Sequence, residues 1–209
     1  MVHQPNDASQ SICPWAASDP LYRHYHDHEW GVPLTDDLSL FSLLMLEAMQ
    51  AGLSWLTILR RRDALLAAFE QFNPERLAIW GPEQLEQQMH NPLIIRNRRK
   101  IEAAVTNARA FLRLRQHTTF SQFLWSFVGG QPQISQWQDM RQVPTATEAS
   151  RAMSQALKQQ GFVFAGPVIC YAFMQSAGLV WDHLADCPRW SWCRSVDYRK
   201  LWPDSARRE

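Results

Sequence analysis

The stretch Leu38 to Trp55 reads LSLFSLLMLEAMQAGLSW, and it indicates a long apolar helix that carries a single carboxylate, Glu47. At helical spacing Glu47 lies one turn from Leu43 and from Ala51, so its face points into protein. Burying an unpaired carboxylate costs on the order of several kcal/mol or shifts its pKa. Two interpretations stay open from these residues alone: a glutamate tied to an arginine or to backbone amides, and a glutamate with a task in a site.

Helix signals continue along the chain, whereas strand signals are nearly absent. Residues 98–114 have apolar positions at helical spacing with arginine and glutamate on the far side, which predicts an amphipathic helix. Caps, prolines and glycines predict further helices from Thr35 or Asp36 to Gly52, from Ser54 through Phe69, after Asn73, after Gly81, over 120–128, from Thr145 to Gly161 and over 167–178. Only GFVFAG shows a brief alternation. We therefore expect an all-α protein with short connections.

The composition is that of a soluble globular protein, with 46% apolar and 20% charged residues in a chain of 209. The ten tryptophans exceed what core packing needs, and several stand in polar contexts, which indicates a surface that stacks against flat ligands. The net charge is only +1, so binding of nucleic acid requires a local patch. Two basic patches qualify, residues 60–62 and residues 96–100, which read RNRRK.

Other classes of protein are disfavoured by what the sequence lacks. No stretch reaches the roughly 18 uninterrupted apolar residues of a membrane span, and the amino terminus does not have the pattern of a signal peptide. We therefore expect a cytoplasmic protein without a membrane partner. The four cysteines are too few and too scattered for a disulfide framework, so metal ligation or simple burial is the expectation.

Several motifs occur in a fixed order along the chain: Cys13-Pro14-Trp15, DPLYRHYHDHEWGVP, LEAMQAGLSW, IIRNRRKI, FLWSFV and GFVFAGPVICYAFMQSAGLVWDH. Together they resemble the bacterial 3-methyladenine DNA glycosylase I family, a branch of the helix-hairpin-helix DNA glycosylases. The resemblance covers residues 13–187 and implies one glycosylase domain of two helical lobes that share a cleft. Residues 1–12 are polar and are expected to be a flexible lead-in, and residues 188–209 form a tail without an assigned role.

The resemblance also implies one structural zinc ion that joins the two ends of the domain. The ligands that it implies are Cys13, His26, His183 and Cys187. Spacing alone leaves open the choice among His24, His26 and His28, and between Cys187 and Cys193. Two cysteines and two histidines close a tetrahedron, so such a metal would not activate water. We interpret Asp182 as a capping or surface residue rather than as a partner of the metal site.

The activity that the resemblance implies is the excision of 3-methyladenine in base excision repair of alkylated DNA. The enzyme flips the nucleotide out of the duplex, and an aromatic pocket binds the cationic base by stacking and cation-π contact. The resemblance places Tyr25, Glu47 and Trp55 against the base, with Trp15, Tyr22 and Trp30 completing the pocket. The Glu47 carboxylate would accept from the amino edge of the base and balance its charge. No lysine stands out as a nucleophile, so we expect monofunctional hydrolysis without lyase action.

The segment NPLIIRNRRKIEAA falls where the family has its helix-hairpin-helix motif. In that motif a tight turn points backbone amides at a DNA phosphate, and Arg96, Arg98 and Lys100 would add sequence-independent charge. Two residues depart from the pattern: Leu93 replaces an expected glycine, and Trp181 replaces a small polar residue before Asp182. The expected partner is double-stranded DNA that contains alkylated adenine, and the expected oligomeric state is a monomer.

Two other functions compete with the glycosylase. The first alternative is a non-catalytic, zinc-stabilised protein that binds alkylated or flipped bases without cutting them. The second is a zinc hydrolase, which requires an open metal position.

Overall fold

The computed structural model describes residues 12–197, and this part of the chain is mostly helical, as predicted. The α-helices are α1 (Pro20–His28), α2 (Asp37–Gln50), α3 (Trp55–Leu59), α4 (Arg62–Ala68), α5 (Pro74–Ala78), α6 (Pro82–Met89), α7 (Arg98–Leu114), α8 (Phe120–Trp125), α9 (Glu148–Gln159), α10 (Pro167–Ser176) and α11 (Pro188–Ser195). The 3-10 turns are η1 (Pro14–Ser18), η2 (Glu70–Phe72), η3 (Ser126–Val128) and η4 (Met140–Gln142), and the strands are β1 (Gln133–Ile134) and β2 (Val180–Trp181). Among these helices none is both long enough and apolar enough to cross a membrane.

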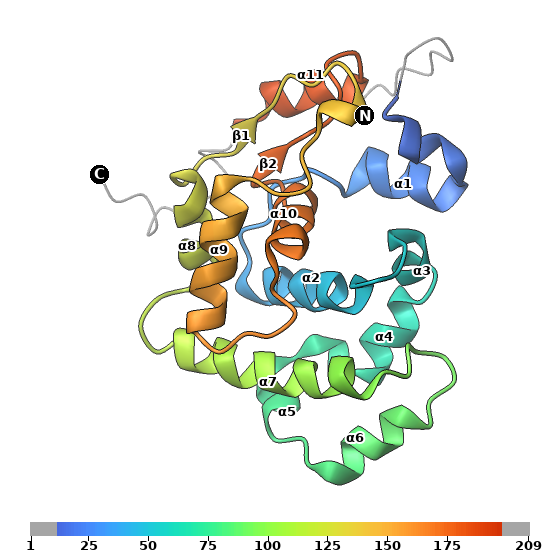
Figure 1. Ribbon diagram of the computed structural model, residues 1–209, viewed down its shortest axis with the longest axis vertical. Helices are drawn as coiled ribbons and strands as arrows, with labels where there is room; N and C mark the ends of the chain where they lie inside the picture. Colours follow the sequence, from blue (N-terminus) through green and yellow to red (C-terminus); the bar gives the residue numbers. More distant parts are fainter. Residues whose placement is uncertain (1–11, 198–209) are drawn as a thin grey trace.

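Helix α2 runs through the centre of the molecule, with α4 to α7 below it and α8 to α10 above it in Figure 1. Asp36 caps it, since the backbone N–H of Ser39 donates to Asp36 Oδ2 at 2.8 Å. The helix is followed by Gly52, whose φ of 78° suits the turn into α3. Most of α2 is buried, because neighbours pack on every side of it. Glu47 is thus held near the middle of the fold.

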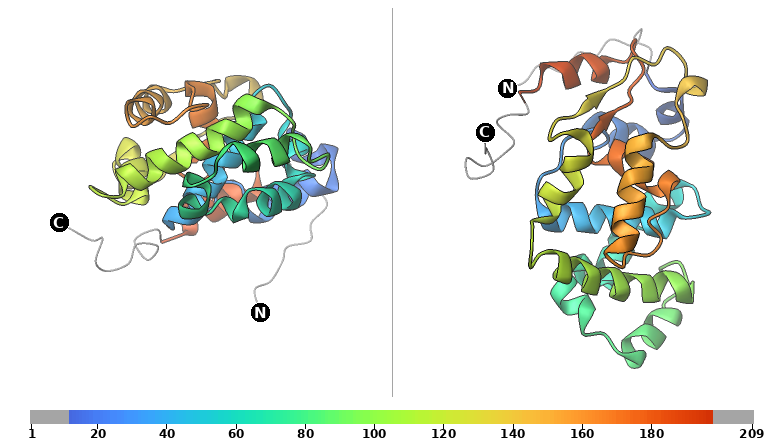
Figure 2. Two further views of the ribbon diagram at one scale, coloured as in Figure 1. Left: turned by 90° about the horizontal axis from the view of Figure 1, so that it is seen from below. Right: turned by 60° about the vertical axis from the view of Figure 1, so that its left-hand side comes forward.

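The two ends of the described chain meet at one end of the molecule. Figure 2 shows α11 at that end and α5 and α6 at the opposite one. Strand β1 pairs with β2 in parallel, in the register Gln133 to Val180 and Ile134 to Trp181. Trp181 is fully buried, so the departure at this position is accommodated inside the core. The strands are two residues long, which is too short to leave a pattern in the sequence.

Two local predictions were wrong in detail. The helix expected from Ser54 through Phe69 is two helices, α3 and α4, separated at Arg60 and Arg61. The cap of α9 is Thr147, whose hydroxyl accepts from the N–H of Ser150, and not Thr145. GFVFAG, whose brief alternation was not enough to predict a sheet, forms the turn between α9 and α10.

The end of α10 is fixed by a close approach that only glycine allows. Gly178 has a φ of +72°, and a Cβ on it would lie 2.5 Å from the backbone nitrogen of Pro33. The N–H of Leu34 donates to the carbonyl of Ala177 at 3.0 Å and holds the same contact. The residues at the end of α10, Gln175 and Ser176, are therefore set against the segment that leads into α2.

Candidate base-binding pocket and metal centre

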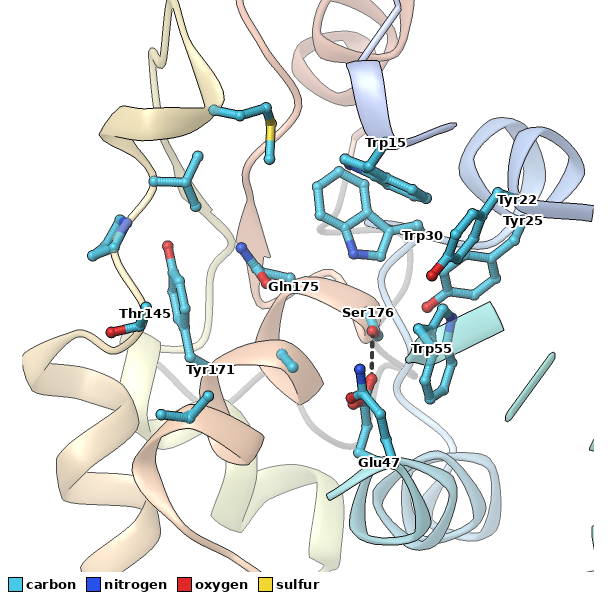
Figure 3. Close-up of a pocket in the computed structure, with 16 residues that line it drawn as sticks. Trp15, Tyr22, Tyr25, Trp30, Glu47, Trp55, Thr145, Tyr171, Gln175 and Ser176 are labelled. Atoms are coloured by element: carbon cyan, nitrogen blue, oxygen red, sulfur yellow. Dashed lines mark hydrogen bonds between the residues drawn. The ribbon is translucent and has the colours of Figure 1, made fainter. Parts of the chain in front are cut away.

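The structure brings six of the predicted site residues to one cavity of about 440 Å³. These residues are Trp15, Tyr22, Tyr25, Trp30, Glu47 and Trp55, and Figure 3 shows their side chains around the cavity. Trp15 belongs to η1, and Tyr22 and Tyr25 belong to α1. Glu47 belongs to α2, and Trp55 is the first residue of α3. Segments from both ends of the chain thus form this pocket, because α10 lies opposite α1.

The aromatic rings of the pocket pack against one another, edge to face or tilted, and so hold each other in place. Trp15 and Trp30 have ring centroids 5.1 Å apart with an interplanar angle of 79°, and Trp15 and Tyr22 are 5.5 Å apart. On the other side Tyr25 and Trp55 are 5.5 Å apart. The hydroxyl of Tyr22 accepts from the N–H of Leu56 at 3.0 Å, which ties α1 to the start of α3. Tyr22 therefore also supports the position of Trp55.

Glu47 is 1% exposed and is bound on one side only. Ser176 Oγ donates to Glu47 Oε1 at 2.7 Å, while Oε2 has no hydrogen-bond partner among the described residues. Burial raises the pKa of Glu47 to about 8, and the bond from Ser176 opposes this increase. The interpretation that a buried arginine neutralises Glu47 is wrong, since no basic group contributes to the pKa of this carboxyl.

Two hydrogen-bond donors of the pocket also lack a partner within residues 12–197. They are the hydroxyl of Tyr25 and the indole N–H of Trp55, both buried. Burial raises the pKa of Tyr25 well above its usual value, and the charge of Glu47 adds to the increase, so the phenol keeps its proton. Buried polar groups are rarely left unpaired in folded proteins. Two donors and one acceptor without partners in one aromatic cavity indicate a place for a flat, polar ligand.

Helix α10 contributes a further wall of the pocket, and none of its residues was among the predicted site residues. Tyr171, Gln175 and Ser176 line the pocket from this helix. Gln175 and Ser176 are polar residues in an otherwise apolar helix, which is the same signal that singled out Glu47. The interpretation of Asp182 as a capping or surface residue was wrong. Asp182 is 1% exposed and accepts hydrogen bonds from Tyr171, Gln175 and Trp137.

The four predicted metal ligands meet in one buried cluster, with their ligand atoms all within 4.8 Å of one another. His26 Nε2 lies 3.1 Å from His183 Nδ1 and 3.5 Å from Cys187 Sγ, and Cys13 Sγ lies 3.8 Å from His183 Nδ1. Tetrahedral zinc with ordinary bond lengths puts such atoms roughly 3.3 to 3.8 Å apart. The geometry selects His26 over His24 and His28, and Cys187 over Cys193. The cluster can therefore hold a metal ion.

The surroundings of the cluster fit a cation. Cys187 and burial hold the pKa of the Cys13 thiol far above its usual value, so both sulfurs can ionise together only beside a positive charge. Burial lowers the pKa of His183 and favours the neutral ring that binds metals. The ring nitrogens that face away from the cluster are also engaged, His26 Nδ1 with Asp27 Oδ1 at 2.7 Å and His183 Nε2 with the carbonyl of Trp30 at 3.2 Å.

The basic turn between α6 and α7 presents only part of the predicted charge to solvent. Arg96 and Arg98 are exposed, and Arg98 pairs with Glu86 at 2.7 Å. Lys100 does not lie at this surface. It is 5% exposed, and its Nζ donates to the carbonyls of Met49 and Ala51, both at 2.7 Å.

Leu93 fits the turn without strain. Positive φ angles at non-glycine residues of the described chain are confined to Glu70, Gln71, Phe72 and Phe164, so position 93 does not require glycine. The backbone N–H of Leu93 donates to Asn91 Oδ1 at 3.0 Å. This amide is therefore already hydrogen-bonded within the turn.

A family model described as Methyladenine glycosylase matches residues 15–190. The chain belongs to this methyladenine glycosylase family. DNA-3-methyladenine glycosylase 1 of Escherichia coli (strain K12) is 49% identical over 176 residues, which are 84% of this chain and 94% of the E. coli protein. The family resemblance that the motifs indicated is thereby confirmed.

Solved structures of methyladenine glycosylases have the same fold. A crystal structure of a 3-methyladenine DNA glycosylase I matches with a TM-score of 0.84 and 50% identity, covering 85% of this chain and 98% of that one. Another, with a tyrosine-to-phenylalanine substitution and in complex with 3-methyladenine, matches with a TM-score of 0.81 and 42% identity, covering 84% of this chain and 95% of that one. The expectation that the protein is a DNA glycosylase is confirmed at the level of this family.

Proposed function

We propose that this methyladenine glycosylase removes 3-methyladenine from alkylated double-stranded DNA by hydrolysis of the N-glycosidic bond. The observation that carries the proposal is the buried Glu47, whose Oε2 has no partner within residues 12–197, in a cavity lined by aromatic rings. A neutral ligand leaves such a carboxyl protonated, whereas a cation compensates the cost of ionising it. The pocket is therefore suited to a flat base that carries a positive charge.

The proposed binding step uses the rings and the unpaired polar atoms together. Flipping a nucleotide out of the duplex costs a few kcal/mol of stacking and pairing, and stacking on aromatic rings recovers roughly 1 to 3 kcal/mol per base. Tyr25 and Trp55 contribute two ring faces and two unpaired donors, and Glu47 accepts from the amino edge of the base. Trp15, Tyr22 and Trp30 complete the pocket. A cationic base gains cation-π attraction that a neutral base lacks.

The proposed reaction breaks the bond between C1′ of the sugar and N9 of the base. The bonding electrons go to the base, which already carries a positive charge and leaves neutral without prior protonation. Water adds to the oxocarbenium-like sugar and loses a proton, which gives an abasic site. Glu47, once ionised beside the base, binds the positively charged nucleotide and holds it in place for this step. The scheme contains no covalent intermediate and hence no lyase step.

We further propose that the Cys13, His26, His183 and Cys187 cluster holds one structural zinc ion, since two thiolates and two imidazoles are a frequent zinc set. The metal would cross-link the two ends of the domain. We propose that Arg96 and Arg98 contact DNA phosphates, because both side chains are exposed. Lys100 is buried and does not take part in this contact. We propose that the protein acts as a monomer.

The experiment that tests the function is release of free base from methylated duplex DNA, resolved by chromatography, for the wild type and Glu47→Gln in parallel. We expect the wild type to release 3-methyladenine and Glu47→Gln to be slower by roughly 100-fold, a loss typical of removing one electrostatic stabiliser. The substitution keeps the size of the side chain and the bond from Ser176, so the fold should persist, and thermal unfolding checks this. Release by neither protein would support the alternative of a non-catalytic binder of damaged bases.

A further inference from the structure

Asp182 stands next to the candidate metal ligand His183 and contacts Tyr171 and Gln175 of α10, which line the pocket. The function proposed above gives Asp182 no role. The residue precedes His183, and its carboxylate is bound by three side chains that are not among the candidate metal ligands. Its Oδ1 accepts from the indole N–H of Trp137 at 2.8 Å. Its Oδ2 accepts from the hydroxyl of Tyr171 and from Gln175 Nε2, the latter at 2.7 Å. A buried carboxylate with three donors has a fixed position.

The bond to Asp182 determines which end of the Gln175 amide is available to a ligand. A carboxylate only accepts hydrogen bonds, so the atom of Gln175 that faces Asp182 is the NH₂ group. In Figure 3 the nitrogen of Gln175 lies on the side of Tyr171, and its oxygen lies on the opposite side. Gln175 lines the cavity. Its carbonyl oxygen is thus the free polar atom that this residue offers to a bound base.

We propose that Asp182 is a positioning residue, which holds the amide of Gln175 so that Oε1 is a second fixed acceptor for the cationic base, besides Glu47. The inference rests on the proposed function. The negative end of the amide dipole faces the cavity and attracts a positively charged base, whereas an NH₂ group in the same place would repel it. Gln175 and Ser176 are neighbours at the end of α10, so both acceptors depend on this helix end. Ser176 holds the carboxyl group of Glu47, and Asp182 holds the amide of Gln175.

The test uses Asp182→Asn and Gln175→Met, alone and combined, in the full-length metal-loaded protein. Asparagine has the shape of aspartate but also donates, so it lets the amide of Gln175 turn around. Methionine has the length of glutamine but no acceptor. We expect each single variant to lower single-turnover excision by roughly 10-fold, the range for one hydrogen bond to a charged group. The double variant should be no slower than Gln175→Met alone, because Asp182 acts through Gln175.

The matched control is Trp137→Phe. It removes another hydrogen bond to the same carboxylate, from a residue outside the pocket, and leaves the bond to Gln175. We expect its excision rate to stay within roughly twofold of the wild type. A second readout separates orientation from loss of structure: the ratio of affinities for free 3-methyladenine over neutral adenine, measured from tryptophan fluorescence. This ratio should fall in both single variants and should be unchanged in Trp137→Phe.

Several results would overturn the inference. One is an unchanged affinity ratio in Gln175→Met, which decides the matter even if Asp182→Asn does not fold. Another is a double variant whose loss equals the product of the two single losses. A wild type that releases 3-methyladenine together with a fully active Gln175→Met would refute the inference alone. A folded wild type that releases no base would refute the proposed function first.

Discussion

The carboxyl group of Glu47 is almost completely buried, and burial raises its pKa from 4.5 to about 8. Between these two pH values the folded protein keeps a proton that the unfolded chain has released. The protein then becomes less stable as the pH rises through this window, because the unfolded state binds fewer protons. A cationic base in the pocket would reverse this preference and release the proton.

A titration of stability tests this property of Glu47. We expect the free energy of unfolding of the wild type, minus that of Glu47→Gln, to fall by about 1.4 kcal/mol per pH unit between pH 5 and pH 8. Taking the difference cancels the titration of the metal ligands, which both proteins share. Tyr25, the titratable group beside Glu47, stays protonated throughout, because burial raises its pKa further. Denaturant unfolding at several pH values measures the effect, and a flat difference would mean that Glu47 is ionised without a ligand.

The role of a single residue can be predicted well from the sequence when its chemistry conflicts with that of its neighbours in the chain. A carboxylate inside LSLFSLLMLEAMQAGLSW pointed to Glu47 without any structure. The same conflict in PVICYAFMQSAG could have indicated Gln175 and Ser176. Their partners, Asp182 and Glu47, are distant in sequence, and no local pattern indicates such pairs.

Helices α2 and α7 are joined by Lys100, whose ammonium group binds two carbonyls at the end of α2. The position of this lysine resembles a cap supplied by another helix, since a cation at a helix carboxyl end interacts favourably with its dipole. The following turn leads to Trp55. Lys100 thus links the hairpin of α6 and α7 to the segment that carries the pocket residues Glu47 and Trp55.

Replacing Lys100 by methionine should lower the stability of the protein without changing its contacts with phosphate. We expect a loss of about 2 kcal/mol in the free energy of unfolding, because two buried carbonyls lose their charged donor. Denaturant unfolding measures it. The salt dependence of binding to undamaged DNA should keep its slope.

Arg98→Met is the matched comparison, from the same basic run. Its pair with Glu86 is exposed to solvent, so losing this pair should hardly change the free energy of unfolding. Loss of a phosphate contact should reduce the salt slope by about 1. If Lys100→Met changed the slope and Arg98→Met did not, the assignment of these two residues would be reversed.

Periodicity predicted the longer elements well, and α7 has the expected bounds of Arg98 and Leu114. The same periodicity could have predicted that Lys100 is buried. Lys100 is four residues before the buried Ala104 and therefore lies on the same face of the helix. The basic run RNRRK hid this signal, because a charged patch is usually solvated. The break at Arg60 and Arg61 and the short ladder of β1 and β2 depend on tertiary contacts that no window of sequence contains.

The cluster of Cys13, His26, His183 and Cys187 brings η1 and α1 together with the segment after β2, and the proposed zinc ion would fasten these parts to each other. These amino-terminal elements carry Trp15, Tyr22 and Tyr25 of the pocket. Sequence spacing alone did not establish this closure, because Cys13 and His183 are 170 residues apart, and only the family resemblance selected the four ligands.

Removing the metal should therefore open one wall of the pocket. A zinc ion present at a thousand times its dissociation constant stabilises a fold by about 4 kcal/mol, which for a chain of this size is roughly 8 to 16 °C in Tm. We expect Cys187→Ser, or treatment with a chelator, to lower the Tm by such an amount and to abolish binding of 3-methyladenine. Differential scanning calorimetry and metal analysis measure both.

Cys193→Ser is the control, since this buried thiol lies outside the cluster and its loss should leave one metal per chain. A Cys187→Ser protein with an unchanged Tm, full base binding and no excision would instead indicate a catalytic metal.

The distance along the chain between Cys13 and His183 also sets an order of events during synthesis. Ribosomes add about 5 to 20 residues per second, so Cys13 waits roughly 10 to 35 s before His183 and then Cys187 are made. During that time α1 has no partner from the carboxyl end and its aromatic residues have no pocket to complete. Because the pocket needs the side chains of η1 and α1, we expect the nascent chain to bind a damaged base only after His183 and Cys187 have been synthesised.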